Sequence, residues 1–171
     1  IMIGGFLNNN CASSAIMMGG QEHLAFDSYR SGFCRTSEVL MGPGYNNIIS
    51  DSQAAAIVTG DLQRLSASNQ GFIGAGCCNC LQNSCYGVIV GGINNNINNG
   101  SSSFIGGGID NKSLCFGTNT HDKTVVVGGS GNKVYADSTF IGGGNSNSAY
   151  GNFGTIVGGF SALNLSLIHI S

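Results

Sequence analysis

The chain has 171 residues, a formal net charge of −2 at pH 7 and 29 Gly, 21 Ser and 20 Asn against only 14 charged residues. Gly, Ser and Asn are weak helix formers, so this composition excludes a helical bundle. The hydrophobic content of 42% with so little net charge also excludes a disordered chain. Six basic residues spread along the sequence leave little to bind phosphates, which argues against a nucleic-acid partner.

Neither end of the sequence carries a recognisable membrane or secretion signal. No apolar run reaches the roughly 18 residues that a membrane span needs, so no membrane insertion is expected here. No signal peptide is visible, and the chain starts at Ile1 rather than Met. Residues 165–171 break the pattern described below and resemble a translated sequencing adapter. We therefore interpret residues 1–164 as one repeat domain from a longer chain and residues 165–171 as a non-native tail.

An internal repeat dominates the sequence. Two apolar residues, a variable residue and two glycines recur, with an Asn four residues after the first glycine, as in VIVGGINN (88–95) and FIGGGNSN (140–147). We call the central apolar residue of each expected three-residue strand its register residue. In chain order the register residues are Met2, Met17, Leu40, Ile57, Ile73, Ile89, Ile105, Val126, Ile141 and Ile156.

The spacings between register residues are 15, 23, 17, 16, 16, 16, 21, 15 and 15. A period of 15–16 residues suits one coil of a β-solenoid or β-roll, in which each coil adds a rung about 4.8 Å along the axis. The sequence therefore predicts an all-β parallel solenoid of about ten coils. Such a rod is about 45 Å long.

The two residues that flank each register residue follow a volume rule. Where the first is Phe (72, 104, 140) the second is Gly (74, 106, 142), and where the first is smaller the second is Val, Ile or Met. Such compensation is typical of a packed interior, so we expect the flanking residues to be buried. The register residues lie on the opposite side and form an apolar stripe, as structural core or trimer face. Because each such side chain gains roughly 1.5–3 kcal/mol on burial, we expect other copies of the chain to cover the stripe. Which of the two apolar faces is the interior of the roll and which is the trimer axis stays open at this point.

The remaining positions predict turns. The residues two and three places after the register residue are small, with Pro43 as a partial exception. An Asn recurs six places after it, and His23, Gln63 and Ala162 are the departures. We expect these amides to stack and to hydrogen-bond along the axis as a structural ladder. The ladder residues are Asn8, Asn46, Asn79, Asn95, Asn111, Asn132 and Asn147.

On strings such as STFIGGGNSN (138–147), the sequence resembles the head repeats of trimeric autotransporter adhesins and related repeats of phage tail fibres. The resemblance covers residues 1–164. It implies three chains intertwined as left-handed parallel β-rolls, located in a virion tail fibre or on a bacterial surface, with no catalysis and no cofactor. The triple-Gly motif, the cysteines and the missing signal favour a phage or virus fibre.

Candidate chemistry is sparse. FIGGGID (104–110) has neither the Gly-Lys-Ser/Thr ending of a phosphate loop nor a helical segment after it. A cysteine–histidine catalytic pair would need Cys34 or Cys115 beside His23 or His121, and no spacing enforces that geometry. We therefore assign no catalytic residue.

Four of the seven cysteines, Cys77, Cys78, Cys80 and Cys85, lie within nine residues but lack the paired C-x-x-C spacing of a zinc site. Three interpretations stay open for them. In the first they are small buried residues, three of them in the turn that elsewhere holds Ile93 and Ile109. In the second they form a disulfide, and in the third they bind a metal.

The two long spacings predict loops that emerge from the solenoid. They contain aromatic and basic residues typical of contact surfaces, for which a host-surface glycan or an outer-membrane receptor is the expected partner. Solvated loops without a partner are the alternative. The contact candidates are Tyr29, Arg30, Phe33, Arg35, Phe116, His121 and Lys123.

A second function class is a single-chain solenoid that binds ice or a repetitive glycan. Steps such as Asn95-Asn-Ile97 and Asn132-Lys-Val134 resemble repeats of plant ice-binding proteins. Against this function, we find no repeat position at which the seven Thr residues stack.

Overall fold

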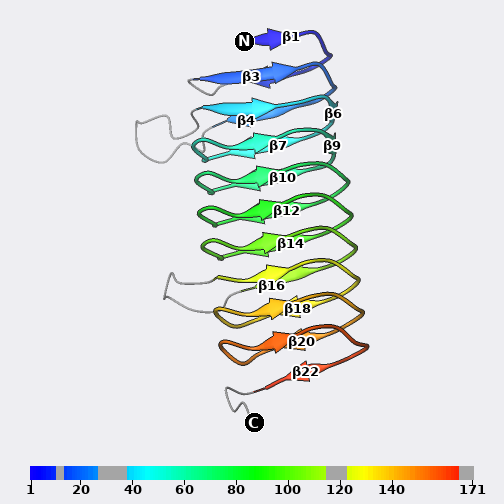
Figure 1. The fold of residues 1–171 in the computed structure, drawn as a ribbon. Coiled ribbons are helices and arrows are strands. Elements are labelled where there is room, and N and C mark those ends of the chain that lie inside the picture. The colour runs from blue at the N-terminus through cyan, green and yellow to red at the C-terminus, as the bar shows by residue number, and fades with distance from the viewer. Residues whose placement is uncertain (11–13, 27–37, 115–122, 166–171) are drawn as a thin grey trace.

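A computed structural model describes residues 1–10, 14–26, 38–114 and 123–165 as a β-solenoid whose coils stack into a rod (Figure 1). Every regular element among these residues is a β-strand, and the strands form two ten-stranded parallel sheets and one two-stranded sheet. The predicted parallel solenoid of about ten coils is therefore confirmed. No helix in the described ranges has the length and apolar character needed to cross a membrane. Residues 166–171 of the expected tail lie outside the described residues.

Each coil contributes one strand to each large sheet. The first sheet contains β1 (Met2–Ile3), β3 (Ala15–Met18), β5 (Val39–Met41), β8 (Ala56–Ile57), β11 (Phe72–Ile73), β13 (Val88–Ile89), β15 (Phe104–Ile105), β17 (Val125–Val126), β19 (Phe140–Ile141) and β21 (Thr155–Ile156). The second contains β2 (Asn9–Asn10), β4 (Leu24–Phe26), β7 (Ile48–Ser50), β10 (Arg64–Ser66), β12 (Cys80–Gln82), β14 (Asn96–Asn98), β16 (Lys112–Leu114), β18 (Lys133–Val134), β20 (Ser148–Ala149) and β22 (Leu163–Asn164). The short third sheet pairs β6 (Gly44–Tyr45) with β9 (Gly60–Asp61) at the corner between them.

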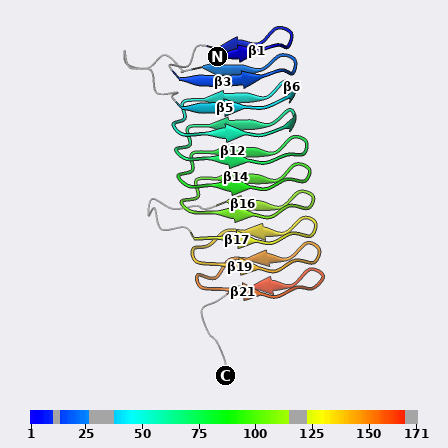
Figure 2. The same cartoon turned by 45° about the horizontal axis from the view of Figure 1, so that its top comes forward.

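The core lies between the two large sheets, which Figure 2 shows as two layers along the rod. Most strands of the two large sheets point one residue inward, and Ile89 in β13 and Ile97 in β14 are both fully buried. Ile57, Ile73 and Ile105 continue the row on neighbouring rungs. The longer strands β3 and β5 bury two residues each. The space between the two sheets is therefore closed and mainly apolar without a second chain.

The structure decides which of the two apolar faces of the first sheet is inside, and it is not the flanking face that the volume rule favoured. The register residues face the interior, and the flanking residues face outward: Ile89 is 0% exposed, whereas Val90 beside it is 47% exposed. Both sides of these strands are apolar, so polarity could not distinguish them. The second sheet decides the matter, because its inward side chains supply the partners of the register residues.

The predicted register of the third coil was wrong. Met41, not Leu40, pairs with Ile57 on one side and with Met17 on the other. Leu40 points outward and is half-buried, while Met41 is fully buried. The run Val39–Met41 is apolar throughout and so permits either register. The ladder residue of this coil accordingly shifts by one place.

Gly residues three places after the register residue fix the corner of every coil. At Gly92 φ is +92°, and a Cβ would lie 2.2 Å from the carbonyl oxygen of Gly108 on the next rung. With Met41 in register, Gly44 takes this position in the third coil, and Pro43 moves to two places after the register residue, where it is still the exception among small residues. The corner glycines are Gly5, Gly20, Gly44, Gly60, Gly76, Gly92, Gly108, Gly129, Gly144 and Gly159.

Candidate functional site

The Asn ladder runs inside the corner of the coil. The Oδ1 of Asn95 accepts a hydrogen bond from the backbone N–H of Asn111 at 3.0 Å. Its Nδ2 donates to the carbonyl oxygens of Gly91 at 2.9 Å and Gly108 at 3.0 Å. The amides thus bond along the axis mainly to backbone rather than to one another; an amide-to-amide bond is found from Asn147 to Asn132.

Asn47, and not Asn46, is the ladder residue of the third coil. Asn47 is fully buried and its Oδ1 accepts from the backbone N–H of Gln63 at 2.9 Å. Asn46, the residue directly before it, lies at the same corner with φ of 50°. The correction follows from the register of Met41.

At two ladder positions another residue replaces Asn, and each of these residues has a buried nitrogen without a hydrogen-bond partner. His23 is 1% exposed; its Nδ1 accepts from the backbone N–H of Asn47 at 3.3 Å, and its Nε2 has no partner. Burial lowers the pKa of His23. Gln63 keeps the acceptor role toward the backbone N–H of Asn79 at 3.0 Å, but its Nε2 has no partner. The ladder is structural and least satisfied at these two rungs.

The outward side of the first sheet, which we call the apolar face, carries no charged residue. Val90, Val127 and Val157 are 47%, 50% and 81% exposed. Thr155 is its single polar residue. The face consists of Ile1, Ile3, Ile16, Met18, Leu40, Gly42, Ala56, Val58, Phe72, Gly74, Val88, Val90, Phe104, Gly106, Val125, Val127, Phe140, Gly142, Thr155 and Val157.

The volume rule therefore operates on the outside of the coil. A Cβ built at Gly106 would meet the ring of Phe104 at 3.3 Å, so the ring extends toward the space left by the glycine. From Leu40 onward the rungs alternate: a large residue with Gly on one rung is followed by a smaller residue with Val on the next. Sequence reasoning missed this two-coil period, because the misplaced register of the third coil hid its first member.

The outward side of the second sheet, which we call the polar face, differs in character. Arg64, Cys80, Asn96, Lys112 and Lys133 form one column of in-register residues on consecutive rungs. A neighbouring column ends in Tyr135 and Tyr150, whose rings stack with centroids 4.6 Å apart and planes at 11°. Sequence reasoning missed this face too, although the Asn-Lys pairs at 111–112 and 132–133 mark it.

The four candidate metal-binding cysteines are distributed over three places. Cys77 lies at a corner in line with Ile93, and its Sγ is 2.9 Å from that of Cys78. Cys80 is on the polar face, and Cys85 is exposed in the opposite turn. Among the described residues, no three His, Cys, Asp or Glu side chains are grouped so as to hold a metal ion.

The environments of Cys77 and Cys80 do not activate their thiols. The pKa of Cys77 is raised, chiefly by its hydrogen bond with Cys78. Burial raises the pKa of Cys80, and the charge of Arg64 opposes that shift in part. A raised thiol pKa leaves less of the nucleophilic thiolate at neutral pH. The interpretation as buried residues does not hold for Cys78 and Cys85, which are exposed.

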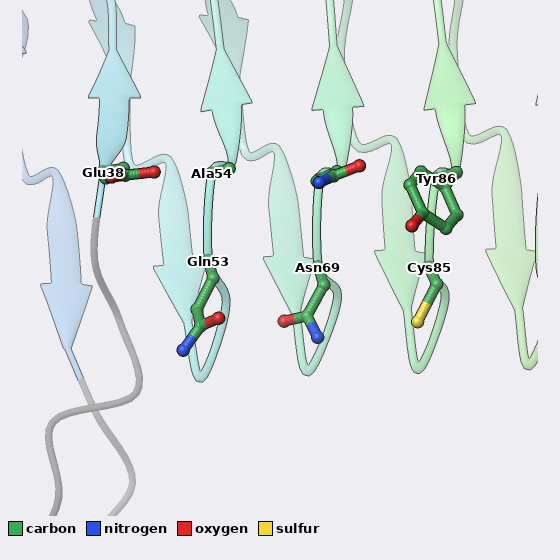
Figure 3. Close-up of a pocket in the computed structure, with 7 residues that line it drawn as sticks. Glu38, Gln53, Ala54, Asn69, Cys85 and Tyr86 are labelled. Atoms are coloured by element: carbon green, nitrogen blue, oxygen red, sulfur yellow. The ribbon is translucent and has the colours of Figure 1, made fainter.

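A shallow hollow of about 390 Å³ lies over the turns opposite the ladder (Figure 3). The residues that line it occupy the same two turn positions on consecutive coils. The hollow therefore results from the stacking of the turns. No cluster of titratable groups converges on it. It is lined by Glu38, Gln53, Ala54, Asn69, Gln70, Cys85 and Tyr86.

Most of the predicted contact residues lie outside the described residues, namely Tyr29, Arg30, Phe33, Arg35, Phe116 and His121. Lys123 is described, and its side chain is exposed just before β17. Cys34 and Cys115, considered for a catalytic pair, also lie outside the described residues. Comparisons with protein-family models, curated proteins and solved structures found no match for this chain. The resemblance to adhesin heads and tail fibres thus rests on the repeat motif.

Proposed function

We propose that this chain is a structural and adhesive segment of a homotrimeric fibre, either a phage or virus tail fibre or a bacterial surface adhesin, and that it has no catalytic role. The apolar face is the observation that carries the proposal. It follows the first sheet over ten rungs, which corresponds to about 45 Å. Soluble monomers rarely expose a continuous apolar surface of that extent.

The volume rule on the apolar face is consistent with a packed partner. Part of the rule arises within one chain, because a Cβ at Gly106 would also lie 2.4 Å from the carbonyl oxygen of Val127. Against a packed partner, the added volume on one residue must be removed from its neighbour. The pairs Phe72/Gly74, Phe104/Gly106 and Phe140/Gly142 satisfy that requirement. A second and third copy of the same chain are the simplest partners, in line with the resemblance to trimeric adhesins.

A single-chain solenoid that binds a regular ligand is the second candidate, because the apolar face is repetitive along the rod. An ice-binding form lacks an outward Thr array. Thr124 and Thr139 do occupy one repeat position on neighbouring rungs, which corrects the sequence-based statement that no Thr residues stack. Both are buried, at 0% and 1% exposure, and therefore offer nothing to a ligand.

Sedimentation of the 171-residue chain and of two charge variants tests the oligomer. Val90 and Ile93 are 47% and 50% exposed and differ in place, because Val90 lies on the apolar face and Ile93 at the corner. We expect a trimer for the parent and for Ile93→Glu, and a monomer for Val90→Glu. A stable, soluble monomer of the parent chain would exclude the trimer and favour the single-chain solenoid.

Attachment of the proposed fibre to a host surface is tested separately. The loop that contains Tyr29 and Arg30, and the loop around His121, are the contact sites expected from sequence. Replacing residues 27–35 with a short Gly/Ser turn should leave assembly intact and reduce cell attachment. Unchanged attachment by an intact trimer would show that this loop takes no part in recognition.

A further inference from the structure

We propose that the polar face of the second sheet binds an acidic polysaccharide, with its carboxylates along the column of cations and its sugar rings against the tyrosine pair. The proposal adds a ligand class to the proposed function and rests on it only for the display of several copies of the face on one fibre. The groups that carry it are Arg64, Lys112, Lys133, Tyr135 and Tyr150.

The first step is the placement of charge. Lys112 and Lys133 lie directly opposite each other on adjacent strands β16 and β18, about 4.8 Å apart. Like charges in that relation are destabilising unless something compensates them. Arg64 extends the column three rungs away, at about 14 Å. Three of the four basic residues in the described part of the chain therefore share one column.

The second step is the absence of compensating acids on this face. The described acidic residues all lie at the corners and in the turns. Asp61, for example, pairs with the corner residue Cys77 on the next rung, and Asp110 directly follows the corner residue Ile109. None of the described residues that point outward from the second sheet is Asp or Glu. An external anion is then the group that can neutralise the column, by charge-assisted hydrogen bonds to the lysines.

The third step is the tyrosine pair at the end of the neighbouring column. The rings of Tyr135 and Tyr150 are stacked, and Tyr150 is 49% exposed. Tyr offers a flat apolar ring and a polar hydroxyl, a combination suited to a sugar with its apolar ring face and its hydroxyl groups.

The charge density favours a polysaccharide over a nucleic acid. Duplex DNA carries a negative charge about every 1.7 Å and its binders neutralise many phosphates at once. The polar face offers three cations on a chain whose net charge is −2. A polyuronate, with about one carboxylate per sugar, matches this sparse column better.

Binding of the chain to alginate, a polyuronate, tests the proposal, with neutral dextran as the comparison polymer. We expect Lys112→Gln and Lys133→Gln each to weaken alginate binding about tenfold, the equivalent of one charged hydrogen bond. Glu38→Gln is the control, because Glu38 is exposed in a turn outside the face and its loss changes the net charge by the same amount, with the opposite sign. Tyr150→Ala should weaken binding, and Tyr150→Phe should largely retain it.

The outcomes are distinct. No binding to alginate, equal binding to dextran, a change of equal size with Glu38→Gln, or tighter binding to single-stranded DNA of equal charge would each overturn the proposal. Alginate binding that survives in monomeric Val90→Glu would uphold it for the single chain. If the parent chain is itself a monomer yet binds alginate through Lys112 and Lys133, the trimer is excluded and the ligand site stands.

Discussion

The ring of Phe104 and the missing side chain of Gly106 are complementary on the outer surface of the coil, since a Cβ at Gly106 would meet the ring at 3.3 Å. The same added atom would lie 2.4 Å from the carbonyl oxygen of Val127 on the next rung. The rung of Val125 and Val127 fills the corresponding space with two residues of moderate size. These two successive rungs of the apolar face thus fill a similar volume in two ways, with a Phe and a Gly on one rung and with two Val residues on the next.

Gly106→Val should lower the free energy of unfolding by roughly 1–3 kcal/mol, as is usual for overpacked sites. The double variant Phe104→Val/Gly106→Val reproduces the pair found at Val125 and Val127 and should recover part of that loss. Thermal unfolding of the parent, both single variants and the double variant gives the coupling energy. Additive effects of the two substitutions would show that the ring and the glycine are independent.

Gly92 and its neighbour Gly91 provide a matched pair at a corner. Gly92 has φ of +92° and no room for a Cβ beside the carbonyl oxygen of Gly108, at 2.2 Å. At Gly91 the nearest atom to a Cβ is 3.6 Å away, and Ala75 occupies the same position one coil earlier. We expect Gly92→Ala to cost about 3 kcal/mol or more, and Gly91→Ala to be neutral or to stabilise by about 0.4–1 kcal/mol.

Chemical denaturation of the two glycine variants measures these effects. Equal stabilities for Gly91→Ala and Gly92→Ala would mean that the corner relaxes easily and that close stacking of coils does not require glycine there. The parent chain serves as the common reference.

Much of the fold was predictable because the repeat constrains it at several positions at once. The spacing of apolar residues, the corner glycines and the ladder amides each predict the same coil. The third coil failed because Leu40 and Met41 are both apolar, so hydropathy alone permits two registers. Requiring a glycine three places on selects Met41, since Gly44 follows it and Pro43 follows Leu40.

Which face is inside was not predictable from a single strand. Ile89 and Val90 are both apolar, and no polar alternation separates them. The information lies in the second sheet, whose inward residue Ile97 requires an apolar partner, while Asn96 and Asn98 face outward. The polar face was missed for a related reason. Lys112 and Lys133 are distant in sequence, and only the stacking of coils places them side by side.

Gln63 is a rung at which the ladder can be improved. Its Nε2 has no partner, whereas the Nδ2 of Asn79 on the next rung donates to Ala75 at 3.1 Å and to Gly92 at 3.0 Å. Gln63→Asn places the shorter amide where those two kinds of carbonyl are within reach. We expect a gain of about 1 kcal/mol, or about 2–4 °C in Tm for a chain of this size.

The converse substitution Asn95→Gln is the control for the ladder. It should destabilise the chain, because Asn95 makes two side-chain donor bonds and accepts one from Asn111. A lower Tm for Gln63→Asn than for the parent would contradict the proposed advantage of Asn at this position.

His23 makes the stability of the solenoid depend on pH in a predictable direction. Burial lowers its pKa below the ordinary value of about 6.5. The unfolded chain then binds a proton at a pH where the folded chain does not, so stability is fully present above about pH 6.5 and falls as the pH drops toward the lowered pKa. The hydrogen bond from the backbone N–H of Asn47 to Nδ1 needs the neutral ring and would be lost on protonation.

His23→Asn restores the common ladder residue and removes this titration. Tm should decrease from pH 7.5 to pH 5.0 by a larger amount in the parent than in His23→Asn, because the effects of all other titrating groups are common to both chains and cancel in the difference. The comparison between the two pH values separates the titration from any gain in stability that Asn brings at every pH. An equal decrease in both chains would show that the ring of His23 is not kept neutral by its burial among the ladder residues.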